Sequence, residues 1–294
     1  MSDNVQTQAE KVITYYNTTA IDYKVFWTGS EDLAIHFGYY DASVKSHKAS
    51  LLKLNEVLAT YAHISASDKV FDAGCGYGGS AIWLAKVIGC QVVGISIVPH
   101  QVREAKIAAE RNKVSDKVNF EAMDYKKTSF PDASFDVVWC VESIVHTDNK
   151  KGFIEESYRL LRSGGRILIS EYMLRDNPPL SQKDKDALSP WLNGWAMSDL
   201  LTPSEYTCLL EAAGFKNVQV HDITENVKRS VTRVGKLRLP MLPTLKAATT
   251  VARVLCALRL FSRVRLQNFE AGIAQINSLR QGHWRYMVIV ADKE

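Results

Sequence analysis

The sequence contains no long uncharged apolar run, and its first ten residues are polar. No stretch reaches the roughly 18 apolar residues that a membrane-spanning helix requires. The segment Met1–Glu10 has no apolar core of the kind found in a secretory signal. These two absences predict a cytoplasmic protein, and they leave attachment to a membrane surface open.

The cysteines show neither a metal-binding nor a redox pattern. None of the five belongs to a C-x-x-C pair, and none lies near a histidine at the spacing of a metal site. We therefore expect reduced, mostly buried thiols and no bound metal. The five residues are Cys75, Cys90, Cys140, Cys208 and Cys256.

Acidic residues are missing from one stretch of an otherwise ordinary chain. The 294 residues are 46% hydrophobic and 23% charged, with a net charge of +4, which is typical of a soluble globular protein. Residues 226–269, however, contain ten Lys or Arg and no Asp or Glu, so the remainder is net negative. Apolar residues alternate with these cations at helical spacing. Such a segment suits a membrane surface or an anionic lipid-like ligand, and a solvated basic face is the alternative.

Apolar periodicity predicts an α/β fold with a Rossmann-like, doubly wound sheet of seven strands. From Lys69 onward, short apolar strands alternate with helices, which predicts a mostly parallel sheet covered on both faces. We expect a helical lid at 1–66, a cofactor-binding core at 67–224, a basic helical cap at 225–283 and the last core strand at 284–294. The cap must hold two or three helices, because it is far longer than a hairpin connection. The strands are expected at 69–72, 91–95, 118–122, 135–141, 166–170, 218–223 and 284–291.

A glycine-rich turn, Asp72-Ala73-Gly74-Cys75-Gly76-Tyr77-Gly78-Gly79, follows the first strand. Glycine lets a backbone turn sharply and approach a ligand closely, and the next helix offers free N–H groups. The spacing fits the G-x-G-x-x-G dinucleotide fingerprint. It also fits the D-x-G-x-G-x-G turn of methyltransferases that use S-adenosylmethionine (SAM). Asp72 favours the second interpretation, because a carboxylate would repel a pyrophosphate but suits the ammonium group of a methionine moiety.

The segments after this turn resemble the ordered motifs of class I SAM-dependent methyltransferases. Asp124 and Tyr125 follow the third strand, where enzymes of this fold hold the adenine amino group. Residues 130–138 and 160–166 match the segments that lead into the fourth and fifth strands. The resemblance covers residues 68–172 and implies SAM as the cofactor. The residues it assigns to the cofactor are Asp72, Gly74, Cys75, Gly76, Gly78, Asp124 and Tyr125.

The end of the second strand departs from the common pattern. An acid usually stands there for the ribose hydroxyls, whereas this sequence has Ser96, followed by Pro99 and Gln101. The pattern resembles the branch that contains tocopherol, sterol and cyclopropane-fatty-acid methyltransferases. Ser96 and Gln101 are therefore the candidates for the ribose side, and a simple helix cap is the alternative.

Three further segments resemble the tocopherol-type enzymes and imply an acceptor site. They are the segment 36–41, which contains His36, Tyr39 and Tyr40, the segment 193–196 with Trp195, and the segment 282–286. Aromatic side chains of the lid, Tyr16 and Tyr23 among them, could form a wall beside a carbocation by cation–π attraction. Ordinary core packing is the alternative for each of them.

Glu142 and His146 are the polar residues that follow the fourth strand. Open parallel sheets bind ligands beyond the carboxyl ends of their strands, so both side chains can face the transferred methyl group. In prenyl-diphosphate and sterol C-methyltransferases, a similar Glu acts as a base or stabilises a cation. We therefore expect Glu142 and His146 to be catalytic, with purely structural contacts as the alternative.

The combination of Glu142 with the acid-free stretch favours C-methylation of a prenyl-type acceptor, such as a prenyl diphosphate, through a carbocation. Arg229 and Arg233 are the candidates that would hold its anionic end, because arginine binds phosphate in a bidentate manner. The alternative is O- or N-methylation of a small apolar or prenylated aromatic acceptor, with His146 as the base. Either way, the partner is a lipophilic small molecule, and the oligomeric state stays open.

A nucleic-acid substrate is disfavoured. The segment 177–180 superficially resembles the N-P-P-Y motif of amino methyltransferases, but it follows the fifth strand and lacks the aromatic residue. The basic stretch is also too apolar for an exposed nucleic-acid face. We therefore expect no nucleic-acid partner.

Overall fold

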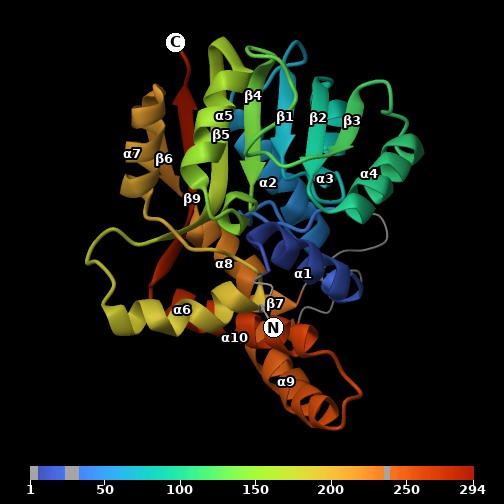
Figure 1. Cartoon of the computed structure of the whole chain (residues 1–294), viewed down its shortest axis with the longest axis vertical. Helices are drawn as coiled ribbons and strands as arrows, with labels where there is room; N and C mark the ends of the chain where they lie inside the picture. The colour runs from blue at the N-terminus through green and yellow to red at the C-terminus, as the bar shows by residue number, and fades with distance from the viewer. Residues whose placement is uncertain (1–5, 24–32, 235–238) are drawn as a thin grey trace, which may run out of the picture.

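A seven-stranded sheet forms the centre of the computed structural model, which describes residues 6–23, 33–234 and 239–294, with the backbone alone at 233, 234 and 239. The strand order is β3-β2-β1-β4-β5-β9-β6 (Figure 1). Strand β9 is antiparallel to both of its neighbours, and the other pairs are parallel. The strands are β1 (Lys69–Ala73), β2 (Gln91–Ser96), β3 (Val118–Ala122), β4 (Phe135–Val141), β5 (Leu161–Leu174), β6 (Lys216–Asp222) and β9 (Trp284–Asp292).

Two groups of helices bury the two faces of this sheet. Helices α5 (Lys150–Leu160) and α7 (Pro203–Ala213) pack on one face through Phe153, Ile154 and Leu210. The other face is covered through side chains such as Leu54, Ile82 and Val102. The elements on that face are α2 (His47–Tyr61), α3 (Gly79–Trp83), the π-helical turn η2 (Leu84–Ile88) and α4 (Pro99–Arg111).

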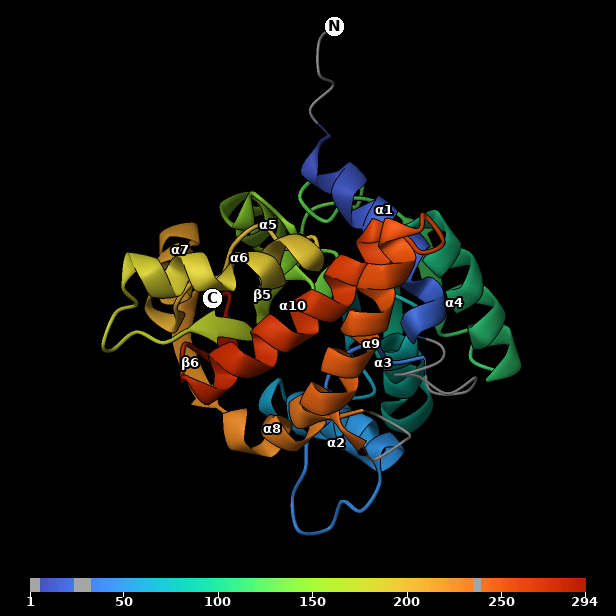
Figure 2. The same ribbon diagram turned by 90° about the horizontal axis from the view of Figure 1, so that it is seen from below.

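The N-terminal helix α1 (Gln8–Asp22) lies across the end of the sheet where the parallel strands finish (Figures 1 and 2). Thr7 and Glu10 begin it with a capping box. At the other end of the helix, the buried carboxylate of Asp22 pairs with the guanidinium of Arg265. Gln8 donates hydrogen bonds of 3.0 and 2.8 Å to the carbonyl oxygens of His146 and Ala196. The lid is therefore fastened at both ends by polar contacts.

The segment between β6 and β9 forms three helices and a short hairpin. The helices are α8 (Thr224–Thr232), α9 (Met241–Ala257) and α10 (Arg263–Arg280), and the hairpin pairs β7 (Arg233–Val234) with β8 (Leu239–Pro240). Helices α9 and α10 lie below the sheet in Figure 1, and Figure 2 shows them side by side, next to α1. The expected insertion of two or three helices is thus present.

Helix α6 (Gln182–Gly194) lies against α10, and sequence analysis did not predict it. Its sequence is polar and carries Pro190 in its interior, which weakens the helical signal. Gly194 allows the close approach, because a Cβ atom there would lie 2.5 Å from the carbonyl oxygen of Gln267. Tertiary contact with α10 therefore stabilises a helix that the local sequence does not predict.

The predicted seven-stranded, mostly parallel sheet is confirmed, and each expected strand is present. The largest difference is β5, which begins at Leu161 and ends at Leu174, because it pairs with β9 from Arg166 to Leu174. Among the residues that the model describes, no helix combines the length and the apolar character needed to cross a membrane.

Two glycines with positive φ offer a test of the turn after β1. Gly78 has a φ of +81° and a Cβ there would lie 2.6 Å from the Phe120 ring, whereas Gly164 has a φ of +76° and open space around it. We expect Gly164→Ala to cost about 1–2 kcal/mol from backbone strain alone. Gly78→Ala should cost about 1–3 kcal/mol more because of the added clash. Urea unfolding of both variants measures the difference, and equal losses would contradict the close packing described for Gly78.

Candidate functional site

One large cavity lies at the carboxyl ends of β1, β2 and β4, beneath α1, α9 and α10. It encloses about 1850 Å³ of atom-free space, its open mouth included. Residues from the glycine turn, the lid and the insertion line it together. No Lys or Arg is among the described residues that line it. Most of its surface is apolar, and the polar groups differ between its two ends.

The glycine turn forms one end of the cavity. Gly74, Cys75 and Gly76 line it, while Gly78 begins α3 in a left-handed conformation and packs on Phe120 instead. Asp72 is only 3% exposed, and its Oδ2 atom has no hydrogen-bond partner. Burial raises the pKa of Asp72 to about 7. An unpaired buried carboxylate is costly, so this position favours a cationic ligand.

Ser96 and Gln101 act as a pair beside this turn. The Ser96 hydroxyl donates to the Oε1 atom of Gln101 at 2.8 Å and accepts from the backbone N–H of Val98 at 3.1 Å. Both polar residues line the cavity and are buried. Because Oε1 is already engaged, the Nε2 amide of Gln101 is left as an unpartnered donor at the cavity. Ser96 therefore orients Gln101, in addition to contacting the start of α4.

Tyr125 and Asp124 are placed differently. Tyr125 lines the cavity, and its hydroxyl donates to the carbonyl oxygen of Ser143 at 3.1 Å. Asp124 does not line it, and its carboxylate accepts from the backbone N–H of Lys126 at 2.9 Å and pairs with the Lys126 ammonium at 3.7 Å. Tyr125 is therefore part of the cavity wall, whereas Asp124 is next to it in the sequence but does not line the cavity.

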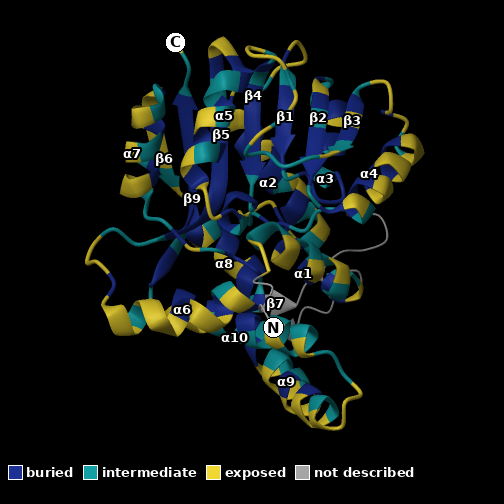
Figure 3. Cartoon of the chain, in the orientation of Figure 1, coloured by how far each residue is buried: buried dark blue, intermediate teal, exposed yellow. Residues whose placement is uncertain are grey.

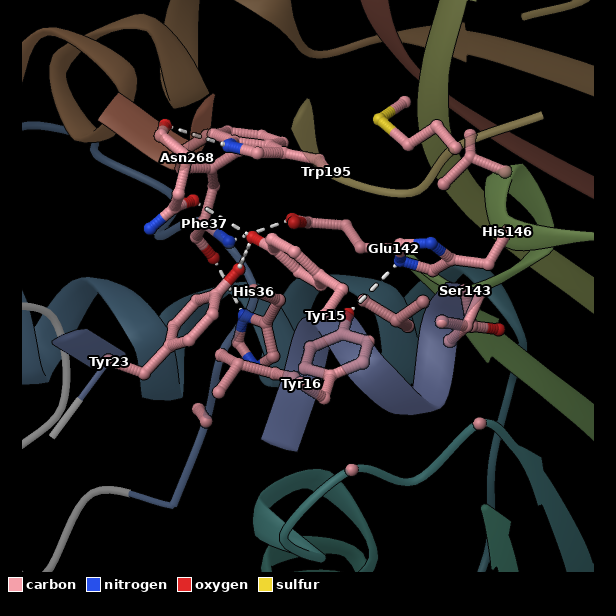
Figure 4. Close-up of a pocket in the computed structure, with 18 of the residues that line it drawn as sticks. Tyr15, Tyr16, Tyr23, His36, Phe37, Glu142, Ser143, His146, Trp195 and Asn268 are labelled. Carbon is pink, nitrogen blue, oxygen red and sulfur yellow. Dashed lines mark hydrogen bonds between the residues drawn. The ribbon is translucent and has the colours of Figure 1, made fainter. Parts of the chain in front are cut away.

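Glu142 lies at the carboxyl end of β4 with a φ of +48°, a left-handed conformation that is uncommon for a residue with a side chain. Its carboxylate accepts from the Phe37 backbone N–H at 2.7 Å, from the Tyr286 hydroxyl at 2.7 Å and from the Tyr172 hydroxyl. Burial raises the pKa of Glu142 to about 7, against the opposing effect of these donors. The carboxylate is thus held firmly at the cavity wall (Figure 4).

His146 follows in a short 3₁₀ turn, η3 (Ile144–His146), and its tautomer is defined by its partners. Nδ1 lies 3.1 Å from the carbonyl oxygen of Ala196, which can only accept, so Nδ1 carries the proton. Nε2 is then an acceptor, and the Tyr16 hydroxyl donates to it at 3.0 Å (Figure 4). Burial lowers the pKa of His146 to about 4, so the ring is neutral at physiological pH.

Aromatic residues of the lid close the opposite end. The Tyr23 hydroxyl donates to that of Tyr15 at 2.9 Å, and Tyr15 donates to the side-chain oxygen of Asn268 at 3.0 Å. Trp195 Nε1–H points to the Asn268 carbonyl oxygen at 3.4 Å. Figure 4 shows these rings facing the same space as Glu142 and His146. His36 also lines the cavity, with its Nδ1 atom 2.7 Å from the Phe37 carbonyl oxygen.

Several expected acceptor residues do not line the cavity. The guanidinium of Arg229 stacks on the Tyr40 ring at 4.6 Å, and the Tyr39 backbone N–H donates to the Ser50 carbonyl oxygen at 2.9 Å. These contacts fix the segment after Phe37 against α2 and α8, so the expected acceptor contacts of Tyr39, Tyr40 and Arg229 are absent here. Arg233 is described only by its backbone. Phe26 and Trp27, which belong to the expected aromatic wall, and Lys236 and Arg238, which belong to the basic stretch, lie outside the described residues.

Neither Tyr172 nor Gln275 was predicted from the sequence to be at the site, and Tyr286 was included only as part of the segment 282–286. Tyr172 and Tyr286 are direct cross-strand partners on β5 and β9, and both hydroxyls reach the carboxylate of Glu142. The sequence shows a tyrosine on each of these two strands. It does not show the register between the strands, which places the two tyrosines opposite each other. Gln275 of α10 is 2% exposed at the cavity, with its Nε2 atom unpartnered.

Comparison with known proteins places the chain in a family. A family model described as a methyltransferase domain matches residues 71–169. The 27-O-demethylrifamycin SV methyltransferase of Amycolatopsis mediterranei (strain S699) is 31% identical over 202 residues, which is 69% of this chain and 74% of that protein. The chain is a class I SAM-dependent methyltransferase.

Other relatives of this methyltransferase differ in their acceptors. A probable tocopherol O-methyltransferase of Oryza sativa subsp. japonica is 32% identical, and the alignment covers 66% of this chain and 57% of that one. The sterol 24-C-methyltransferase of Saccharomyces cerevisiae (strain ATCC 204508 / S288c) is also 32% identical, over 57% of this chain and 42% of that one. The enzyme thus spans about half the length of these two relatives. The predicted resemblance to tocopherol and sterol methyltransferases is confirmed.

Solved structures share the fold of this methyltransferase over nearly its whole length. The [4+2]-cyclase SpnF has a TM-score of 0.77 at 19% identity, with 98% of this chain and 97% of that chain covered. A geranyl diphosphate methyltransferase in complex with GPP and sinefungin has a TM-score of 0.72 at 18% identity, with 98% and 99% covered. At these identities the likeness establishes the fold.

The buried carboxyl of Glu142 has a consequence for the stability of the methyltransferase. Its folded-state pKa of about 7 lies above the ordinary glutamate value of 4.5, so the folded protein retains a proton that the unfolded chain has released. We therefore compare the free energies of unfolding of wild type and Glu142→Gln. The value for wild type minus that for the variant should fall as pH rises from about 4.5 to 7, by up to about 1.4 kcal/mol per pH unit.

Urea titrations at several pH values measure this difference. The exposed Glu110→Gln variant is the matched control, because Glu110 lies on the solvent side of α4. A Glu142 difference that is flat across this range, or one that the control reproduces, would contradict the description of Glu142.

Proposed function

We propose that this methyltransferase transfers a methyl group to a hydroxyl oxygen of a neutral, lipophilic acceptor, with His146 as the general base. The observation that carries the proposal is the imidazole of His146, neutral and locked in one tautomer, whose Nε2 lone pair meets a hydroxyl at 3.0 Å in an apolar cavity. An acceptor hydroxyl that takes the place of the Tyr16 hydroxyl at Nε2, while the Tyr16 ring still covers the site, would be oriented and deprotonated by the same nitrogen.

We assign the cofactor to the end of the cavity that the glycine turn forms. The unpaired Oδ2 atom of Asp72 suits the ammonium group of SAM, and the free Nε2 amide of Gln101 suits a ribose hydroxyl. Gly74 and Gly76 line the space between them, and Tyr125 borders it. These donors and acceptors fit the cofactor, which supplies a methyl group on a positively charged, and therefore electrophilic, sulfur.

The reaction then requires positioning and one proton transfer. The acceptor O–H bond breaks and its proton moves to His146 Nε2. An O–CH₃ bond forms at the expense of the methyl–sulfur bond that SAM would supply, whose electron pair stays on sulfur and leaves a neutral thioether. The imidazolium that results would be a buried cation, and Glu142, which lines the same cavity, would stabilise it when ionised. The lid residues Tyr16 and Tyr23 exclude water from the reacting groups. Positioning alone can contribute about 7–11 kcal/mol to such a transfer.

The charge distribution favours a neutral acceptor over a prenyl diphosphate. No described lining residue is a Lys or Arg, and burial lowers the pKa of both His36 and His146 to about 4, so neither supplies a cation. Two basic residues of the insertion are paired outside the cavity: Arg265 with Asp22 and Arg253 with Glu270. A prenylated phenol meets these conditions, whereas a diphosphate would be buried without a counter-charge.

C-methylation is the second candidate, and the position of Glu142 favours it. A buried carboxylate beside the rings of Tyr172 and Tyr286 could stabilise a carbocation or remove the proton that follows carbon methylation. Three donors already occupy this carboxylate, however, so its capacity as a base is limited. The position of the methyl group in the product separates the two candidates.

The His146→Ala variant tests the proposal. We expect kcat to fall by about 10²- to 10⁴-fold with a prenylated phenol, because the general base is lost, while SAM affinity stays within a few-fold of wild type. The matched control is Tyr16→Phe, which removes only the hydroxyl that meets Nε2 and should retain most of kcat. Product mass spectrometry follows both variants. A methyl group found on carbon, or an unchanged kcat for His146→Ala, would contradict O-methylation by this base.

A further inference from the structure

The far end of the α9–α10 hairpin exposes a group of large apolar side chains. Val251, Val254, Leu258 and Leu260 are 60%, 59%, 62% and 73% exposed. All four lie within ten residues, at the end of α9 and in the turn that follows it. Figures 1 and 3 show this end projecting away from the sheet, with much of its surface exposed. We call these four residues the hairpin tip.

Basic residues surround the hairpin tip, and acidic residues are scarce there. Arg259 and Arg263 are exposed and form no ion pair with any described residue, and Lys246 is exposed one to two turns earlier. Residues 226–269 contain no Asp or Glu. Exposed apolar side chains flanked by unpaired cations suit a negatively charged lipid surface. The apolar side chains enter the interface, and the cations contact the anionic head groups.

The same helix connects the hairpin tip to the cavity. Met241, Leu245 and Ala248 of α9 line the cavity. Val251 lies one turn beyond Ala248, and Val254 and Leu258 follow at spacings of three and four residues, so neighbouring side chains continue the apolar surface outward. An acceptor that leaves a bilayer at the hairpin tip would meet apolar side chains along α9 as far as the cavity wall.

We propose that the hairpin tip docks this protein on an anionic lipid bilayer, from which a lipophilic acceptor passes along α9 into the cavity. Docking stands on the exposed residues alone, whereas the loading of an acceptor rests on the proposed function. Two copies of the chain would bring like charges together at this surface, and an exposed apolar surface does not suit a nucleic acid. The positive charge around the hairpin tip and its apolar side chains together favour an anionic lipid surface over these two partners.

Flotation with vesicles tests docking. The full-length protein should bind vesicles of phosphatidylcholine mixed with phosphatidylglycerol, bind pure phosphatidylcholine much more weakly, and lose binding as salt is added. Arg259→Gln combined with Arg263→Gln should weaken binding by about fivefold for each charge removed. Leu258→Asp combined with Leu260→Asp should weaken it at least as much, because it removes apolar contact and adds negative charge.

The control variant is Val87→Asp, which alters a side chain that is 62% exposed on η2, outside the hairpin and the cavity. It should bind mixed vesicles like wild type. Failure of wild type to float with mixed vesicles, or equal loss in Val87→Asp and the Leu258→Asp/Leu260→Asp variant, would overturn docking. A wild-type dimer that dissociates in that variant, without vesicle binding, would assign the surface to a second copy and also overturn it.

Acceptor loading is tested separately from the chemistry. The Leu258→Asp/Leu260→Asp variant should methylate a detergent-dispersed prenylated phenol at the wild-type rate and lose activity at least tenfold when the phenol is supplied in mixed vesicles. Equal activity from both sources would overturn loading through the hairpin tip. Vesicle binding without methylation of any supplied acceptor, by wild type as well, would instead refute the proposed function and leave docking intact.

Discussion

The carboxylate of Asp72, buried and with one oxygen unpaired, is the constraint on which the site depends. A charged group in this environment costs free energy that the rest of the fold must offset, and its pKa of about 7 reflects that cost. Strand β1 holds the residue between β2 and β4, so the carboxylate cannot turn away to solvent. The glycines after it keep the adjoining space free of side chains. The fold thus leaves a buried carboxylate whose charge a cationic ligand would neutralise.

The remaining polar groups of the cavity follow the same electrostatic pattern. Asp72 and Glu142 are buried acids with raised pKa values, while burial keeps His36 and His146 neutral. Among the described residues, no basic side chain enters the cavity. A site of this composition stabilises positive charge and rejects negative charge. It suits a sulfonium cofactor. On the proposed function it would also accommodate the proton released by an uncharged acceptor, and it offers a diphosphate no counter-charge from a described basic side chain.

The sequence predicted the sheet well because its strands are buried and short, and because glycines mark the turns between them. It also placed Glu142, His146 and the glycine turn at one edge, since parallel strands end together. What it could not predict depends on contacts between distant segments. Tyr172 and Tyr286 meet at Glu142 only through the antiparallel register of β9, and α6 is stabilised by its packing on α10. Likewise, the acid-free stretch gave no sign that Asp22 of the lid pairs with Arg265.

Calorimetric titration of SAM into wild type and Asp72→Asn across pH 5.5–8 measures what the charge of this carboxylate contributes to cofactor binding. Because the ammonium group prefers an ionised partner, wild-type affinity should fall as pH drops below about 7, by up to about tenfold per unit, and the Asn variant should bind weakly with little pH dependence. If the variant instead binds SAM as tightly as wild type, with the same pH profile, Asp72 does not hold the ammonium group.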